Sequence, residues 1–240
     1  MQKVGIVGGM GPESTVDYYQ SIISKFQEKI GSQEDLPELF INSINMYKMF
    51  NLLIKGQTEK LINYLADAVQ RLENIGSDFV VISANTPHIV FEQVQQRVKV
   101  PMISIVEETY IKAEEMGLEK VGLLGTKFTM ESDFFKKPFI SNHKDIIVPN
   151  RLEQDFIHKK IVEELENGIV NIETKEEFLN IVTQMIKRDN IQGVILGCTE
   201  LPMLIKNDDL NIHQLNTTEI HVNKIVDVIF MDKKLFTLLN

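Results

Sequence analysis

The 240-residue chain carries a formal net charge of −9; 43% of its residues are hydrophobic and 25% are charged. This composition is typical of a globular protein, and the negative charge opposes attraction to nucleic acid or to an anionic membrane surface. No apolar run approaches the roughly 20 residues that cross a bilayer, and no secretory leader precedes the first apolar segment. A single cysteine forms no internal disulfide, which suits a reducing compartment. We therefore predict a cytoplasmic protein.

Apolar and amphipathic segments alternate along the first half of the chain. They predict strands at 4–7, 39–44, 79–82 and 102–104, and helices at 14–30, 58–75, after His88 and at 106–116. The loop Gly8-Gly9-Met10-Gly11-Pro12 follows the first strand. It lacks the third glycine of a dinucleotide-binding fingerprint, and no acidic residue ends the second strand. We interpret the loop as a tight turn that lets the backbone approach a small anion.

The second half repeats this alternation. It predicts strands at 121–125, 146–149, 193–197 and 212–215, and helices at 154–167, 175–188 and 218–230. Strands that alternate with helices indicate mainly parallel sheets covered on both faces. The segments 4–85 and 121–199 each run strand, helix, strand, helix, strand. We predict an α/β fold of two parallel-sheet lobes, 1–99 with 215–240 and 100–214, related by pseudo-twofold symmetry across a cleft.

The only cysteine ends one of the predicted buried strands. Cys198 follows the apolar run 193–197, and Thr199 and Glu200 open a short helix after it. In an open α/β sheet, ligands bind at this end of the strands. A helix N-terminus also favours the thiolate form of a nearby cysteine. The alternative is a small buried hydrophobe, which is the commonest fate of a lone cysteine.

An earlier stretch has the same layout as the cysteine strand. The run 79–82 ends in Ser83-Ala84-Asn85-Thr86-Pro87-His88, with Ala84 at the place that Cys198 takes in the second copy. Ser83 carries a hydroxyl, but strand alternation directs it to the opposite side. Asn85 and Thr86 are small hydrogen-bond donors at a strand–helix turn. The chain therefore builds the same sheet edge twice, once with a thiol and once with a methyl group.

Four motifs, in this order and spacing, carry a resemblance to a known family. They are 8–15 (GGMGPEST), 85–88 (NTPH), 125–130 (GTKFTM) and 197–200 (GCTE). The chain resembles the cofactor-independent aspartate/glutamate racemases. The resemblance implies two Rossmann-like lobes with the active site between them, a homodimer, and no pyridoxal phosphate or metal. It also implies two cysteines that flank the substrate's Cα, one removing its proton and the other returning one to the opposite face.

The resemblance assigns roles to particular residues. Cys198 matches the second catalytic cysteine, and Ala84 stands where the first is missing. The candidate substrate-binding residues are Met10, Asn85, Thr86, Thr126, Thr129, Thr199, Glu200, Lys48, Lys159 and His88, with His221 as a weaker one. The asparagine and threonines suit an α-carboxylate and the charge that develops on it, although the same residue types also cap helices. The two lysines suit a distal carboxylate, although most lysines are solvated surface charges.

These observations predict a pyridoxal-phosphate-independent racemase of aspartate, glutamate or both, acting by thiol-based proton transfer at Cα. Ala84 leaves the source of the second proton open, with water or His88 acting through water as candidates. Two other classes remain. One is a single-thiol decarboxylase or isomerase of a related acid, and the other is a non-catalytic protein that binds a dicarboxylate.

Overall fold

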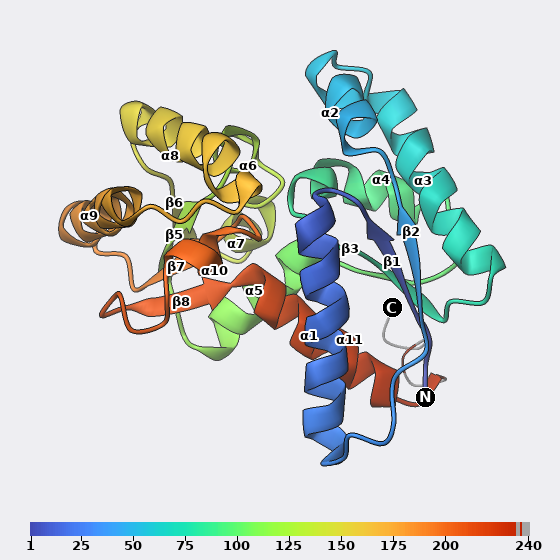
Figure 1. The fold of residues 1–240 in the computed structure, drawn as a ribbon. Coiled ribbons are helices and arrows are strands. Elements are labelled where there is room, and N and C mark those ends of the chain that lie inside the picture. The colour runs from blue at the N-terminus through green and yellow to red at the C-terminus, as the bar shows by residue number, and fades with distance from the viewer. Residues whose placement is uncertain (234–235, 237–240) are drawn as a thin grey trace. The chain divides into compact units, whose positions relative to one another are not determined.

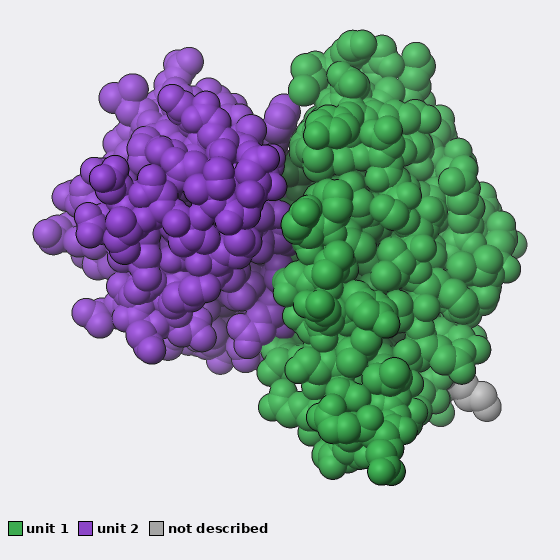
Figure 2. Space-filling model, viewed as in Figure 1, with its two compact units in different colours: residues 1–105, 221–240 green, residues 106–220 purple. Residues whose placement is uncertain are grey.

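The computed structural model describes residues 1–233 and 236, and the chain divides into two compact units (Figure 2). Unit 1 comprises Met1–Ile105 and His221–Asn240, and unit 2 comprises Val106–Ile220. The observed divisions lie after residues 105 and 220, a few residues beyond the expected 99 and 214. The reason is strand pairing, because the strand at 102–103 pairs within the first sheet and the strand at 213–216 within the second.

Unit 1 contains a four-stranded parallel sheet in the order β2-β1-β3-β4 (Figure 1). Its elements are β1 (Val4–Gly8), α1 (Pro12–Ile30), β2 (Leu39–Ser43), α2 (Met46–Ile54), α3 (Thr58–Asn74), β3 (Phe79–Ile82), η1 (Thr86–Val90), α4 (Phe91–Gln95) and β4 (Met102–Ile103). Most of α11 (Thr217–Phe230) also belongs to this unit.

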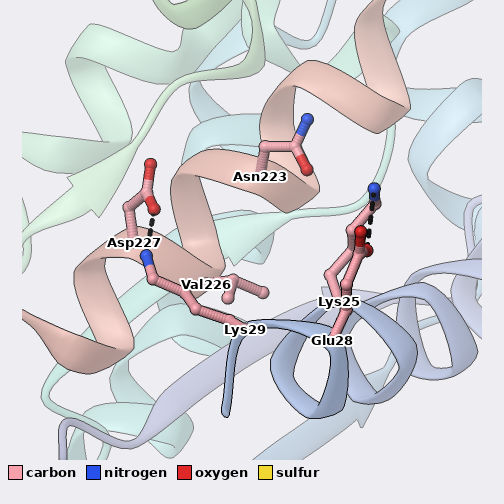
Figure 3. A pocket seen from close by; sticks show the side chains of 6 residues that line it. All are labelled: Lys25, Glu28, Lys29, Asn223, Val226 and Asp227. Carbon is pink, nitrogen blue, oxygen red and sulfur yellow. Dashed lines mark hydrogen bonds and ion pairs between the residues drawn. The ribbon is translucent and has the colours of Figure 1, made fainter. Parts of the chain in front are cut away.

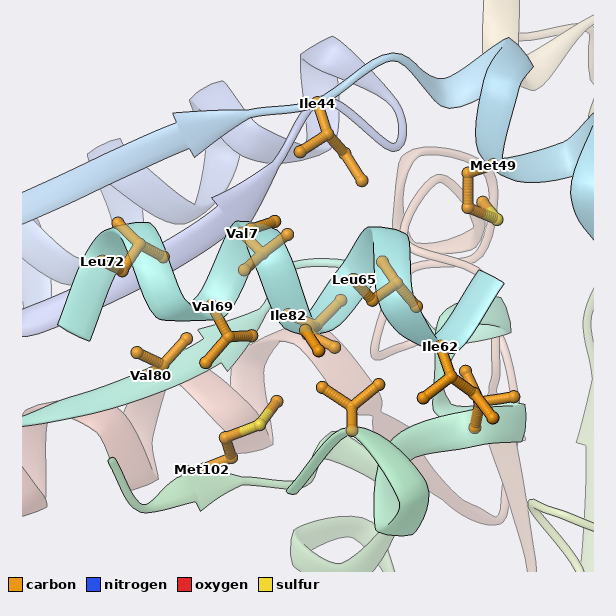
Figure 4. Packing of buried hydrophobic residues seen from close by; sticks show 14 of the residues in the cluster. Val7, Ile44, Met49, Ile62, Leu65, Val69, Leu72, Val80, Ile82 and Met102 are labelled. Carbon is orange, nitrogen blue, oxygen red and sulfur yellow. The ribbon is translucent and has the colours of Figure 1, made fainter. Parts of the chain in front are cut away.

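Helices cover both faces of the unit 1 sheet, as the buried residues of alternating strand positions require. On one face, Leu65 and Val69 of α3 pack against Val7, Val80 and Ile82 (Figure 4). On the other face, residues of α1 and α11 pack against the alternate positions of β1 and β3. Strands β1 and β3 are therefore buried on both faces, whereas the edge strand β2 is partly exposed.

Unit 2 contains a second parallel sheet, in the order β6-β5-β7-β8. Its elements are α5 (Ile105–Glu115), β5 (Lys120–Leu124), α6 (Lys127–Glu131), α7 (Lys137–Ser141), β6 (Asp145–Ile147), α8 (Arg151–Glu163), η2 (Leu165–Asn167), α9 (Ile172–Asp189), β7 (Gly193–Leu196), α10 (Leu201–Leu204) and β8 (His213–Asn216). Both sheets thus place the second, first, third and fourth strands of their unit side by side. The predicted α/β fold with a repeated parallel layout is confirmed.

Within the described part of the chain, each helix is too short or too polar to span a bilayer.

Candidate active site

Cys198 lies at the carboxyl end of β7, beside the end of the neighbouring strand β5. Gly197 donates its N–H to the carbonyl of Leu124 at 2.8 Å. A Cβ on Gly197 would lie 2.7 Å from that same oxygen, so the close approach of the two strand ends requires glycine here. The Cys198 side chain is only 8% exposed and contacts the unit 2 core. The strand pairing thus fixes the position of the cysteine at the carboxyl end of the parallel sheet.

The thiol of Cys198 donates a hydrogen bond to a carboxylate. Its Sγ lies 2.8 Å from Oε2 of Glu200, and the hydroxyl of Thr199 donates to the same oxygen, also at 2.8 Å. Burial, followed by the negative charge of Glu200, raises the pKa of Cys198 well above that of a free thiol. At neutral pH the resting group is therefore a thiol, and Glu200 is the base within its reach.

The expectation that a helix N-terminus favours the thiolate is wrong for this resting site. Helix α10 has only four residues, Leu201–Leu204. The dipole of such a short helix is small beside the desolvation of a buried sulfur and the charge of an adjacent carboxylate. Thiolate formation at Cys198 thus requires a specific proton acceptor.

A second carboxylate, on Glu166, belongs to a neighbouring segment of unit 2. Its segment η2 packs against α10, whose N-cap residue is Glu200. Burial, and then the charge of Glu200, raise the pKa of Glu166. Glu166 in turn contributes to the raised pKa of Cys198. The sequence analysis did not single out Glu166, since it belongs to an acidic run, 163–166, that is typical of a solvated helix surface.

Two of the predicted threonines line the same edge of unit 2. Thr126 caps α6, its Oγ1 accepting from the N–H of Thr129 at 3.4 Å, and the two hydroxyls are 3.2 Å apart. A Cβ built on Gly197 would lie 3.3 Å from the Thr129 methyl group, so Thr129 adjoins the residue before the cysteine. The structure therefore brings Thr126, Thr129, Cys198 and Glu200 to one end of one sheet. It also shows that Thr126 is a helix cap.

At the carboxyl end of the unit 1 sheet, hydroxyl groups hold the loop after β1 in place by hydrogen bonds. Ser14 Oγ donates to the Ser83 carbonyl at 2.9 Å, and Thr15 Oγ1 accepts from the Gly9 N–H at 2.7 Å. Thr15 and Ser83 are buried, with their hydroxyl oxygens 3.4 Å apart. One amide of the glycine-rich loop is therefore already used within the protein. The network fixes this loop against the residue that precedes Ala84.

The loop after β1 has a backbone that only glycine accepts. Gly9 has a φ of +83°, and a Cβ there would lie 2.4 Å from the carbonyl oxygen of Ile44. The next predicted substrate-binding residue, Met10, has its side chain in the unit 1 core. Met10 can therefore contribute to a site through its backbone but its side chain is a packing residue.

Ala84 is 6% exposed, and its neighbours Asn85 and Thr86 are also buried where η1 begins. The Ala84 carbonyl accepts from Nδ1 of His88 at 2.9 Å, and Nε2 of His88 accepts from the N–H of Ile105 at 3.3 Å. This arrangement fixes His88 as the neutral tautomer that is protonated at Nδ1. Burial lowers the pKa of His88 to about 4.

The hydrogen bonds of His88 disfavour the alternative in which it supplies a second proton through water. Both of its ring nitrogens have protein partners, and its ring stacks on Phe91 with centroids 5.0 Å apart. His221 is equally occupied, since Nδ1 lies 2.9 Å from the hydroxyl of Tyr18 and Nε2 lies 3.2 Å from the carbonyl of Ile103. Burial, with a smaller effect of His88, lowers the pKa of His221 to about 3. Both histidines hold the fold of unit 1.

The two predicted lysines lie on exposed helix surfaces. Lys48 of α2 places its Nζ 4.4 Å from the ring centroid of Tyr64. Lys159 of α8 is 65% exposed, with its Nζ 3.9 Å from the Glu163 carboxylate. Lys160, the next residue along the helix, is ion-paired with Glu164. The positive charge of Lys159 is thus partly balanced by a neighbour on its own helix.

A surface groove of about 420 Å³ lies elsewhere in unit 1, between α1 and α11 (Figure 3). Its charges are paired, Lys25 with Glu28 at 3.2 Å and Lys29 with Asp227. It contains none of the predicted site residues. Within residues 1–233 and 236, no three His, Cys, Asp or Glu side chains lie grouped so that they could hold a metal ion.

The four sequence motifs, the repeated parallel sheet and the position of Cys198 at the end of β7 agree with a family assignment. The Asp/Glu/Hydantoin racemase family model matches residues 7–225 of the chain. The chain belongs to this family. Over 153 residues it is 32% identical to the broad specificity amino-acid racemase RacX of Bacillus subtilis, covering 63% of the chain and 66% of that protein. A glutamate racemase of Bacillus cereus is 25% identical over 148 residues, covering 61% of the chain and 53% of that protein.

Solved structures of racemases share the fold. An aspartate racemase homologue from Pyrococcus horikoshii has a TM-score of 0.85 and 36% identity, covering 96% of this chain and 100% of that one. A glutamate racemase from Aquifex pyrophilus has a TM-score of 0.62 and 18% identity, covering 96% and 84%, which shows likeness of fold alone. The predicted resemblance to the aspartate/glutamate racemases is confirmed.

Proposed function

We propose that this racemase-family protein breaks and forms the Cα–H bond of an α-amino acid, with Cys198 as the group that exchanges the proton. Aspartate and glutamate are the first substrates to test. The observation that carries the proposal is the hydrogen bond from the Cys198 thiol to Glu200 at the end of β7. A cysteine that were only a packing residue would have no need of a half-buried carboxylate at this distance.

The proposed reaction begins with proton transfer from the thiol. Cys198 passes its proton to Glu200 and becomes a thiolate, and the thiolate then removes the Cα proton. The electron pair of the broken Cα–H bond moves into the substrate's carboxylate, which becomes an enediolate. Hydrogen-bond donors stabilise such developing charge, and Asn85, Thr86 and Thr126 are our candidates for this role.

Ala84 limits this chemistry to one face of Cα. A methyl group neither accepts nor donates a proton, and the ring nitrogens of His88 are both engaged. Proton removal from one enantiomer should therefore be faster than from its mirror image. Net racemisation needs a second proton source, for which water is the remaining candidate.

A second function, stereospecific decarboxylation of a substituted malonate, is favoured by one specific observation. Burial and Glu200 keep Cys198 protonated, and a protonated thiol is ready to act as an acid. Loss of CO₂ would leave an electron pair on Cα, and the thiol would supply the proton to one face. This reaction needs one thiol only, so it has no use for a cysteine at position 84.

Proton exchange in heavy water tests both proposals. Each enantiomer of aspartate and glutamate is incubated with the protein in D₂O, and loss of the Cα proton is followed by NMR. We expect exchange of one enantiomer at least ten-fold faster than the other, and none with Cys198→Ala. A methylmalonate sample tests the second function by release of CO₂. If no amino acid exchanges and no CO₂ forms, while the ligands still bind, the dicarboxylate-binding alternative is the better one.

A further inference from the structure

We propose that the first turn of α11, through the hydroxyl group of Thr218, binds the α-carboxylate of the substrate. The proposal deepens the proposed function and rests on it, since it names the group that holds the substrate beside Cys198. Thr218 lies outside the four sequence motifs. Strand β8, which leads into this turn, carries none of the candidate residues named above.

The first turn of α11 lies at the same end of the unit 2 sheet as Cys198. Helix α11 follows β8 directly, and β8 pairs with β7 in parallel so that Asn216 is the partner of Leu196 (Figure 1). Neighbouring strands lie about 4.8 Å apart. Cys198 follows Leu196 by two residues, and Thr218 follows Asn216 by two residues. Because ligands bind at the carboxyl ends of parallel strands, the thiol and this turn border the same ligand-binding end.

Two neighbours of Thr218 fix the backbone of this turn. The hydroxyl of Thr217 is buried and donates to the Leu196 carbonyl at 2.9 Å, which ties the start of the helix to β7. The side chain of Asn216 accepts from the N–H of Glu219 at 3.2 Å and so caps the helix. The anchoring and capping roles of polar side chains at a helix start are therefore filled without Thr218.

Thr218 has a buried hydroxyl group without a hydrogen-bond partner among the residues that the structure describes. The residue is 4% exposed, and its Oγ1 is fully shielded. Buried hydroxyls are almost always hydrogen-bonded, because an unpaired one has lost its contact with water without compensation. A valine of the same shape would avoid this cost. The hydroxyl therefore points to a partner that is not part of the chain.

Its position separates Thr218 from other buried groups of this kind. Gln2 Oε1 and Ser77 Oγ also lack a partner within the described chain, but these residues precede β1 and β3. They lie at the amino ends of the strands, opposite the end at which a parallel sheet binds ligands. Thr218 combines a buried unpaired hydroxyl with a place at the ligand-binding end.

The chemistry of the turn favours an anion. Helix α11 has 14 residues, and the N-terminus of such a helix carries a partial positive charge that attracts a carboxylate. Glu219, the acidic residue of this turn, is exposed to solvent. The hydroxyl of Thr218 adds a hydrogen-bond donor at the same end. A substrate whose Cα lies beside Sγ of Cys198 carries its α-carboxylate directly on that carbon, so this carboxylate is the one within reach.

This donor acts most strongly during the reaction. When the Cα proton passes to the thiolate, its electron pair moves into the α-carboxylate, which becomes an enediolate with a larger negative charge. Thr218 keeps its own proton, and its hydrogen bond strengthens as the charge on the acceptor grows. Loss of the hydroxyl should therefore slow proton exchange more than it weakens binding.

Thr218→Val removes the hydroxyl and keeps the shape of the side chain. The affinity for aspartate and glutamate, measured by calorimetry, should fall about ten-fold, and Cα exchange in D₂O should fall by about 10²-fold. Thr218→Ser should retain most of both. Thr183→Val is the control, since the hydroxyl of Thr183 already donates to the Leu179 carbonyl at 2.8 Å on α9, and it should change neither.

Two amides of aspartate identify the carboxylate that is bound. Asparagine keeps the α-carboxylate, whereas isoasparagine has an amide in its place. Thr218→Val should weaken the binding of asparagine by the same factor as that of aspartate, and the binding of isoasparagine by less. The reverse order would place the distal carboxylate at Thr218 and overturn the assignment.

Thermal unfolding without ligand distinguishes ligand binding from a structural role. Because valine leaves no unpaired hydroxyl, the midpoint of Thr218→Val should stay the same or rise by up to about 4 °C. A fall of more than about 2 °C would show that the hydroxyl has a structural partner, such as an ordered water molecule, and would overturn the proposal.

The outcomes separate this site from the proposed function. Weaker binding in Thr218→Val, without Cα exchange in the natural chain, would refute the proposed reaction and leave the carboxylate site standing. Cα exchange with equal rate and affinity in Thr218→Val and in the natural chain would refute the site alone. If aspartate, glutamate and asparagine all fail to bind the natural chain, both proposals are wrong.

Discussion

Acidification should destabilise unit 1 through two buried histidines. His88 is 5% exposed and His221 is fully buried, and burial is the main cause that lowers their pKa values to about 4 and about 3. A histidine whose pKa is lower in the folded state stabilises the fold above its ordinary pKa of about 6.5. That stability is lost as the pH falls from about 6.5 toward the folded values, since the unfolded chain then binds more protons.

The magnitude follows from proton linkage. Between pH 7 and pH 5, each histidine takes up most of a proton in the unfolded chain and almost none in the folded unit. At about 1.4 kcal/mol per pH unit and proton, integration gives about 2 kcal/mol for each histidine and about 4 kcal/mol for the pair. Domains are commonly stable by about 5–15 kcal/mol, so a loss of this size is readily measured. Asp78, whose pKa is lowered, contributes mainly below this pH window.

Urea unfolding at pH 7, 6 and 5, followed by circular dichroism, checks this expectation. The other three histidines lie in unit 2, so hydrogen exchange of β1 and β3 peptides isolates the response of unit 1. In His221→Gln, the amide can still donate to the Ile103 carbonyl and accept from Tyr18, and it does not titrate. That variant should lose about half of the pH dependence. A natural chain whose free energy of unfolding changes by less than about 1 kcal/mol would refute the burial of two neutral histidines in unit 1.

Three further changes test other parts of the structure. Gly9→Ala should lower the free energy of unfolding by at least about 2 kcal/mol, because a Cβ would lie 2.4 Å from a backbone carbonyl and φ is +83°. Gly31→Ala is the control, since φ is +65° but nothing lies within 4 Å of the Cβ, and it should lower the free energy of unfolding by less. Ala84→Cys should raise racemisation by about 10²–10⁴-fold, the contribution of a positioned acid or base, with ligand affinity little changed; an unchanged rate would show that another group supplies the second proton. Lys48→Met or Lys159→Met should weaken the binding of aspartate more than that of alanine, measured by calorimetry, and equal effects would remove that lysine from a distal-carboxylate subsite.

Much of the fold is predictable from the sequence because the central strands β1, β3, β5 and β7 are short, buried apolar runs. Every strand of both sheets lies within a few residues of its predicted position, since apolar runs such as 79–82 have no other place in a globular fold. The missed elements are short helices, including α2 (Met46–Ile54). Its cap was visible in the sequence, as Asn45 accepts from the N–H of Lys48 at 3.0 Å, but nine residues give too short a pattern to distinguish from a loop.

The site was predictable in its residue types and not in its electrostatics. Cys198 and Glu200 are neighbours in sequence, so their proximity is visible in the motif. The raised pKa of Cys198 depends first on burial by the unit 2 core, which only the tertiary fold provides, and then on Glu200. Likewise, the ring nitrogens of His88 are engaged by Ala84 and by Ile105, a residue that only the tertiary fold brings near. Tertiary contacts thus set the environment of both side chains, which the local sequence does not reveal.

The hydrogen bonds around Ala84 bear on the role of this end of the unit 1 sheet. This end of the sheet lacks a thiol, yet its hydroxyls and His88 hold the glycine-rich loop and the Ala84 carbonyl through buried hydrogen bonds. Buried polar networks of this kind are costly when incomplete. If this end of the sheet served proton transfer alone, these hydrogen bonds would have no role once the thiol is absent. We therefore expect the edge to bind and orient a ligand in its present form, so that Ala84→Cys changes the rate of racemisation far more than the affinity.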